Sequence, residues 1–244
     1  MFVDHIHQMF ASFGAPVWLT YPGRMVFPLF LFAAADSFHY TSDRKAYMQR
    51  LLLASWSMTL ISAVLQVMLP NKTVVLINNA FSTFFLTGLY VVFWDRLVMG
   101  IQEKNARKIV STALFWLVPA LSSLPALLIV QFVGHLPLPI IRAALILSML
   151  IPNLLLVEGG ALMVFLGLAF YILRKQRLAQ IGVLLAFSAI IFKVGSGMQW
   201  LMGLAAIPMI LYNGERGKGF KWFFYIFYPV HIFVLYVTAT VLAK

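Results

Sequence analysis

The feature that most constrains this chain is a series of apolar runs, each close to the length that crosses a lipid bilayer. The clearest of these runs cover residues 51–69, 81–93, 109–133, 178–192 and 222–242. A helix needs about 20 consecutive apolar residues to span the hydrocarbon core. The 244-residue chain is 62% hydrophobic, and its mean hydropathy of +0.93 lies outside the range of ordinary soluble domains. We therefore expect an all-α, polytopic membrane protein that forms a single domain over residues 1–244.

The basic residues indicate how the chain is oriented in the membrane. Lys and Arg number 18 against 7 Asp and Glu, and most of them fall in four short loops that separate apolar runs. These loops cover residues 40–47, 95–108, 174–177 and 213–221. Basic loops tend to stay on the cytoplasmic side of a membrane, so we place all four there. Positive charge distributed in this way indicates topology and does not predict a nucleic-acid partner.

A parity argument predicts an irregular segment in the second half of the chain. Lys108 and Arg174 both lie in cytoplasmic loops, so the chain between them must cross the bilayer an even number of times. Three apolar stretches lie there, however, at 109–133, 138–157 and 160–173. The middle stretch carries Pro139, Arg142, Pro152 and Asn153, and Pro137 directly precedes it. Irregular backbone survives at membrane depth only where protein or water covers it. We predict that 138–157 is a re-entrant or interfacial segment, and that the chain has about nine crossing helices.

Two further observations limit the chemistry. The sequence contains no cysteine, which excludes disulfides, thiolate nucleophiles and Cys-ligated metals. We expect no metal, and any nucleophile or base must be another residue type. The first apolar run, from Met1 to about residue 17, is short for a span and shows no signal-peptide pattern. Its length suggests that the natural protein begins upstream of Met1.

Ionisable residues inside the apolar runs are the strongest functional candidates, because each costs about 2.5–3.5 kcal/mol to insert at the centre of a bilayer. The opening stretch MFVDHIHQMF contains Asp4, His5 and His7. Asp4 and His5 point about 100° apart on a helix, so they need different partners. Asp4 can reach His7 or Gln8 on its own helix, or Arg24 or His231 on another. A buried imidazole with an acceptor behind it can act as a general base, although the same residues also occur as plain interhelical hydrogen-bond pairs. His7 is better explained as a satisfied or interfacial histidine.

Two more elements carry candidates. Arg24 stands at the start of the second apolar span, where its long side chain either snorkels to the interface or serves a site. Tyr228 and His231 share one face of the last helix, and His231 lies about ten residues inside its apolar run. The loop NGERGKGFK at 213–221 lacks the Ser or Thr of a Walker motif, but a basic glycine-rich turn can hold an anion.

Several stretches taken together resemble the TraX family, whose members are membrane proteins associated with N-acetylation of conjugal pilin. The stretches are VDHIHQMF, GRMVFPLFLF, VEGGALMVFLGLAFYILR, NGERG and FYIFYPVH. In that family the first helix carries an Asp-His pair, the second begins with Gly-Arg followed by Phe-Pro, and the last carries a His in an aromatic strip. The corresponding residues here are Asp4, His5, Gly23, Arg24, Phe27, Pro28, Tyr228 and His231.

The resemblance implies a multi-pass acetyltransferase of the bacterial inner membrane that moves an acetyl group from acetyl-CoA to an amine or hydroxyl. The acceptor would be a pilin N-terminus or a glycan. The implied catalytic residues are Asp4, His5, Arg24, Tyr228 and His231, with His5 as general base or transient acetyl carrier. The anionic phosphates of acetyl-CoA would meet a basic rim, which we define as Arg44, Lys45, Arg174, Lys175, Lys218 and Lys221.

Two other functions are compatible with the same residues. In a secondary transporter or proton-coupled carrier, the buried Asp and His residues would relay protons; the lack of a visible internal repeat argues mildly against it. In a structural partner of a secretion or conjugation apparatus, they would only hold helices together.

Overall fold

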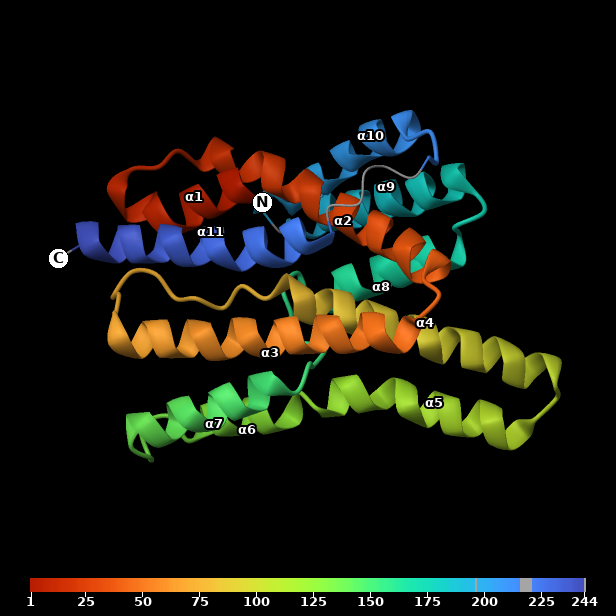
Figure 1. Ribbon diagram of the computed structural model, residues 1–244, viewed down its shortest axis with the longest axis horizontal. Coiled ribbons are helices and arrows are strands. Elements are labelled where there is room, and N and C mark those ends of the chain that lie inside the picture. Colours follow the sequence, from red (N-terminus) through yellow and green to blue (C-terminus); the bar gives the residue numbers. More distant parts are fainter. Residues whose placement is uncertain (196, 216–220, 244) are drawn as a thin grey trace. The chain divides into compact units, whose positions relative to one another are not determined.

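The computed structural model describes residues 1–195, 197–215 and 221–243, and Figure 1 shows helices joined by loops, with no strand in this part of the chain. The expectation of an all-α polytopic protein is confirmed. The helices are α1 (Phe2–Phe10), α2 (Thr20–Tyr40), α3 (Arg44–Met68), α4 (Ala80–Gln102), α5 (Ala106–Leu121), α6 (Leu124–Gln131), α7 (Leu138–Leu150), α8 (Gly160–Ile172), α9 (Arg177–Val194), α10 (Ala206–Leu211) and α11 (Lys221–Leu242). Three 3₁₀ segments accompany them, η1 (Ala11–Phe13), η2 (Val17–Leu19) and η3 (Gly197–Ala205).

Six helical stretches among the described residues are long and apolar enough to cross a membrane. They are Val17–Tyr40, Arg44–Met68, Ala80–Gln102, Ala106–Gln131, Arg177–Val194 and Trp222–Leu242. Three shorter apolar stretches accompany them, Leu138–Leu150, Gly160–Ile172 and Gly197–Leu211. The protein is therefore a multi-pass membrane protein, and the total of about nine crossings stays a prediction.

The chain forms two compact units, and α2 and α3 each run from one into the other. The terminal unit comprises residues 1–36, 62–76 and 172–244, and the central unit comprises 37–61 and 77–171. All five candidate catalytic residues belong to the terminal unit. The single-domain organisation stays a prediction.

In the central unit, the middle apolar stretch of the parity argument is interrupted. Residues 151–159 between α7 and α8 are not helical, in the region where prolines and Asn153 predicted irregular backbone. Protein donors and acceptors satisfy this backbone: Trp56 Nε1 donates to the carbonyl of Leu150 at 2.7 Å, and the Leu154 N–H donates to the carbonyl of Pro119 at 2.9 Å. Such internal bonding is what backbone at membrane depth requires.

The lengths of α7 and α8 bear on the parity argument. Helices α7 and α8 have 13 residues each, so each rises only about 20 Å against a hydrocarbon core of about 30 Å. We interpret α7, the irregular segment and α8 as one interrupted crossing that returns the chain after the crossing of α5 and α6. On this interpretation two crossings would separate Lys108 from Arg174, and the re-entrant or interfacial character of 138–157 stays a prediction.

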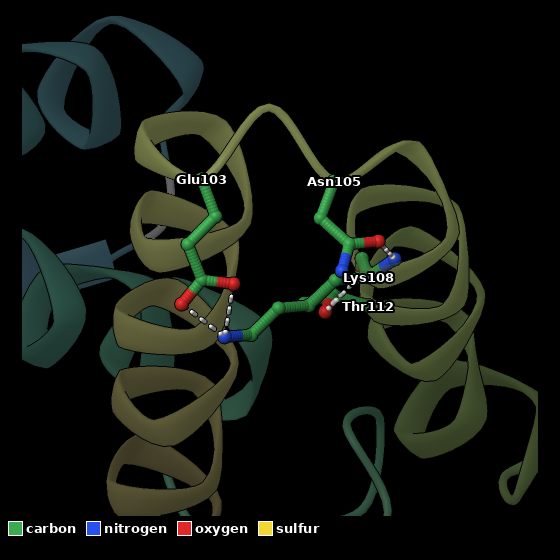
Figure 2. Close-up of polar contacts among 4 residues, drawn as sticks. All are labelled: Glu103, Asn105, Lys108 and Thr112. Atoms are coloured by element: carbon green, nitrogen blue, oxygen red, sulfur yellow. Dashed lines mark hydrogen bonds and ion pairs between the residues drawn. The ribbon is translucent and has the colours of Figure 1, made fainter.

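The turn between α4 and α5 is shorter than the sequence suggested. A loop was expected over 95–108, but α4 continues to Gln102, because charged residues do not prevent a helix from extending beyond the bilayer. Figure 2 shows how the turn is fixed. The side-chain oxygen of Asn105 accepts from the Lys108 N–H at 3.0 Å and so caps α5, while Lys108 Nζ lies 3.1 Å from both carboxylate oxygens of Glu103.

In the terminal unit, α1 lies alongside α11, and the start of α2 packs against α1 (Figure 1). Gly23 on α2 makes the second contact possible. A Cβ atom at this position would lie 2.6 Å from Asp4 Oδ2 and nearer still to the Cβ and Cγ atoms of Asp4. Only glycine allows two helices to approach this closely. The Gly-Arg pair of α2 is thereby placed next to the Asp-His pair of α1.

Candidate functional site

The centre of the candidate site is a pair of buried histidines from opposite ends of the chain. His5 on α1 is 2% exposed and His231 on α11 is 5% exposed. His5 Nδ1 lies 2.8 Å from His231 Nε2, and the two rings stack with their centroids 5.0 Å apart and their planes 20° apart. Both residues are candidates from the sequence, where His231 was a possible partner of Asp4, but their pairing is new.

The hydrogen bonds of this pair determine which nitrogen carries the basic lone pair. His231 Nδ1 lies 2.6 Å from the backbone carbonyl of Phe227, which can only accept, so Nδ1 carries the proton. In the neutral imidazole, Nε2 of His231 is then an acceptor, and His5 Nδ1 must donate to it. The lone pair of neutral His5 is consequently on its Nε2 atom.

Aromatic rings surround the histidine pair. The Phe227 ring stacks on His231 with a centroid separation of 4.8 Å, and the Phe2 ring meets His231 edge-on at 5.8 Å. Tyr228, which is buried, lies with its ring centroid 6.2 Å from that of His5. These apolar faces keep water away and so strengthen the hydrogen bonds between the histidines.

Asp4 faces α2 and not the histidine pair. Its carboxylate packs on Gly23, and the charge of Arg24 acts on it. Of the four partners proposed from the sequence, Arg24 is the one with which the structure associates it most directly. The arrangement gives the two charged side chains opposite signs in one half-buried region, which lowers the cost of placing either in an apolar environment.

A third element, η3, binds the side chain of Arg24. Its Nη1 atom donates to the Oε1 atom of Gln199, on η3, at 3.0 Å. Its Nε atom is buried and has no hydrogen-bond partner within the described part of the chain. Pro28 lies one turn later inside α2 and has no N–H to donate to the carbonyl of Arg24. The guanidinium therefore retains a buried donor that a ligand can use.

Gln199 was missed because the search considered only ionisable residues. An uncharged amide inside the apolar stretch Gly197–Leu211 is a weaker signal, but it is a signal of the same kind. His7, by contrast, lies as expected: its Nδ1 atom donates to the carbonyl of Ala15 at 2.9 Å and closes the turn after α1.

The residues of the basic rim have different environments. Arg44, in the central unit, forms an ion pair with Asp95 at 2.8 Å, bonds the Tyr171 hydroxyl at 3.3 Å and lies over the Phe38 ring at 5.0 Å. The neighbouring Lys45 is exposed. The Arg44 side chain therefore has structural partners that the sequence analysis did not foresee.

Arg174 and Lys175 are brought together at the turn between α8 and α9. With Ile172, Leu173 and Gln176 they line a pocket of about 290 Å³ in the terminal unit. Lys218 lies outside the described residues, as does the side chain of Lys221, whose backbone begins α11. The CoA-binding role of all six rim residues stays a prediction.

Comparison with known families identifies the chain. The model of the family described as TraX protein matches residues 1–239. The chain belongs to the TraX family. This match covers every stretch on which the resemblance was based, and it includes the whole histidine pair, Arg24 and Gln199. No curated protein and no solved structure matches the chain.

The site of this TraX family member shows no sign of a metal centre within the residues that the structure describes. No group of three or more His, Cys, Asp or Glu side chains there could hold a metal ion. The chemistry available from the described residues is proton transfer at the histidine pair and hydrogen bonding or charge stabilisation by Arg24.

Proposed function

We propose that this protein is an integral-membrane acetyltransferase that moves an acetyl group from acetyl-CoA to an amine or hydroxyl, with a pilin N-terminus as the favoured acceptor. Membership of the TraX family supports the reaction class and the acceptor. The observation that carries the proposal is the buried His5–His231 hydrogen bond of 2.8 Å, because it orients one imidazole through another in a dry site.

In this mechanism, His5 Nε2 accepts the proton of the attacking amine or hydroxyl. The new bond forms between the acceptor nitrogen or oxygen and the acetyl carbonyl carbon. The tetrahedral intermediate then collapses, the carbon–sulfur bond breaks, and His5 returns the proton to the sulfur of CoA. His231 holds the His5 ring through Nδ1 and stabilises the imidazolium while it exists.

Arg24 is the proposed stabiliser of the oxyanion. Negative charge develops on the acetyl oxygen during attack, and a buried, preoriented donor interacts strongly with that charge. The unpartnered Nε–H of Arg24 has these properties. Asp4 compensates the Arg24 charge in the resting state, and Tyr228 forms the wall of the site beside His5 and is a second candidate donor to the carbonyl.

The cytoplasmic end of the substrate would bind outside the membrane. Arg174 and Lys175 are the proposed contacts for the CoA phosphates, since they line one pocket and carry two positive charges. At about 290 Å³ the pocket is too small for the whole CoA molecule and suits only its phosphate-bearing end.

The test is transfer of radiolabelled acetyl from acetyl-CoA to a peptide with a pilin N-terminus, using purified protein in liposomes. The variants are His5→Ala and, as a matched control on the same helix, His7→Ala. We expect His5→Ala to lose at least about 99% of the rate, since general-base catalysis contributes about 10²–10⁴-fold. His7→Ala should keep most of it. Full activity of a folded His5→Ala protein would remove His5 from the mechanism.

The interrupted crossing of α7 and α8 favours one second candidate, a carrier. Many carriers bind their substrates at discontinuous helices near the middle of the membrane. Uptake of a solute or of protons into proteoliposomes in the absence of acetyl-CoA would support this function. A protein that transfers acetyl groups but drives no such uptake excludes it.

A further inference from the structure

The hydrogen bond between Arg24 and Gln199 joins residues that lie 175 positions apart in the chain. Gln199 belongs to η3, a nine-residue 3₁₀ segment that follows α9. Such a run is long for this type of helix, and 3₁₀ stretches within helical regions often occur at functional positions. Both side chains are half-buried. The contact therefore fixes the only Arg of α2 from a separate element of the terminal unit.

The geometry of the contact leaves one donor of Arg24 available. A guanidinium is planar and has five N–H donors in a rigid fork, so binding one nitrogen restricts the directions of the others. Gln199 accepts from Nη1 at 3.0 Å, whereas the buried Nε has no partner among the described residues. A buried donor without an acceptor is unfavourable in a resting protein, and an acceptor supplied by a ligand would remove this cost.

The chemical type of residue 199 matters as much as its position. A neutral amide oxygen accepts a hydrogen bond from Arg24 without cancelling its charge. A carboxylate at the same place would hold the guanidinium equally well but would neutralise it, and a neutralised pair stabilises an oxyanion poorly. A glutamine thus orients the guanidinium without adding a second negative charge to that of Asp4.

We propose that Gln199 is a positioning residue that aims the Nε–H of Arg24 at the acetyl oxygen during transfer. The inference rests on the proposed acetyltransferase function and extends it to a residue outside the family motif stretches quoted above. Gln199 itself does not touch the substrate; it acts by fixing the plane of the guanidinium.

The experiment compares Gln199→Met, which keeps the side-chain length and removes the acceptor, with Gln199→Glu, which keeps the acceptor and adds a negative charge. Gln102→Met, at an exposed position of α4, is the matched control. For each purified full-length protein, kcat and KM for acetyl-CoA and the melting temperature in detergent are measured. A further variant combines Gln199→Met with Arg24→Lys and is compared with Arg24→Lys alone.

We expect kcat to fall about tenfold to a hundredfold in Gln199→Met, because misplacement of a catalytic group by about 1 Å can cost that much. We expect a similar fall in Gln199→Glu, because the new carboxylate weakens the positive charge that stabilises the oxyanion. The KM for acetyl-CoA should stay within about twofold, since the contact acts on the transition state and not on the CoA phosphates. Gln102→Met should match the wild type. In the Arg24→Lys background, Gln199→Met should change kcat by less than about twofold, since the group that it orients is gone.

A purely structural role gives a different pattern. Gln199→Glu would then have a melting temperature equal to or above that of the wild type, and its kcat would also be that of the wild type. This result would overturn the inference. Wild-type kcat in Gln199→Met, or full additivity with Arg24→Lys, would overturn it as well. If Gln199→Met fails to fold, the kcat of the near-isosteric Gln199→Glu decides alone. Absence of acetyl transfer by the wild-type protein would instead refute the proposed function.

Discussion

Gly23→Ala tests the close approach of α1 and α2 that positions the candidate site. The added Cβ would lie 2.6 Å from Asp4 Oδ2 and closer to two carbon atoms of the same side chain. Ordinary contact begins at about 3.4 Å, so the helices must separate by about 1 Å to accept the methyl group. The carbon atoms nearest the backbone cannot move away by a simple rotamer change, and the displacement must therefore involve α1 itself.

This displacement has two measurable consequences. Overpacking of this kind costs about 1–3 kcal/mol, against which the better helix propensity of alanine contributes about 1 kcal/mol, so the melting temperature should fall by a few degrees. A shift of α1 by about 1 Å also lengthens the 2.8 Å contact between His5 and His231 beyond the range of a hydrogen bond. We therefore expect acetyl transfer to fall at least about tenfold.

Gly182→Ala is the control for this prediction. Gly182 lies inside α9 of the terminal unit, and a Cβ there meets no atom within 4 Å. This variant should be as stable as the wild type or gain up to about 1 kcal/mol from helix propensity, with full activity. The assays are thermal unfolding in detergent and the acetyl-transfer rate. Wild-type stability and rate in Gly23→Ala would show that α1 and α2 are not held at this distance.

Four further changes are informative. His231→Phe keeps an aromatic ring but removes the acceptor for His5, so it should reduce the acetyl-transfer rate about a hundredfold and leave expression unchanged. Arg174→Met should raise the KM for acetyl-CoA several-fold. Asp95→Asn, which breaks the Arg44 ion pair, should leave that KM unchanged and lower the melting temperature only slightly, since partly exposed pairs contribute about 0.2–1 kcal/mol. A changed KM in Asp95→Asn with an unchanged KM in Arg174→Met would move the CoA site to Arg44. Asn105→Ala removes the cap of α5 shown in Figure 2 and should cost about 0.5–2 kcal/mol, measured by chemical unfolding, without changing the rate.

Apolar run length predicted the class of fold because a bilayer imposes one physical requirement on every crossing segment. It failed where length alone does not decide the structure. The charged stretch 95–108, expected as a loop, is largely the end of α4, whereas the non-helical residues 151–159 begin within the stretch 138–157, where irregular backbone was expected. The turn after α4 is held by hydrogen bonds between residues close in sequence, whereas the segment after α7 is bonded to residues far along the chain. Such bonds, for example that of Trp56 to Leu150, leave no periodic trace in the sequence.

The candidate site was predictable in its residue types but not in its pairing. His5, His231, Asp4 and Arg24 stood out because each is costly in an apolar run. Their pairing depends on which helices are neighbours, and the histidines are 226 positions apart. Gln199 gave too weak a signal, because an amide is much less expensive to bury than a charge.

The choice of two histidines as the central pair has a physical explanation. A histidine backed by a carboxylate, as in many soluble hydrolases, would place a permanent negative charge beside the base, and an apolar site would have to accommodate it. A second imidazole can be neutral in the resting state, and here its Nδ1–H donates a hydrogen bond to the carbonyl of Phe227. The charged residues lie apart from this pair: Asp4 on α1 packs against the start of α2, and Arg24 on α2 donates to Gln199 on η3. In the proposed reaction a proton leaves one substrate atom while negative charge grows on another. A neutral base, His5, and a separate fixed positive charge, Arg24, fit these two needs.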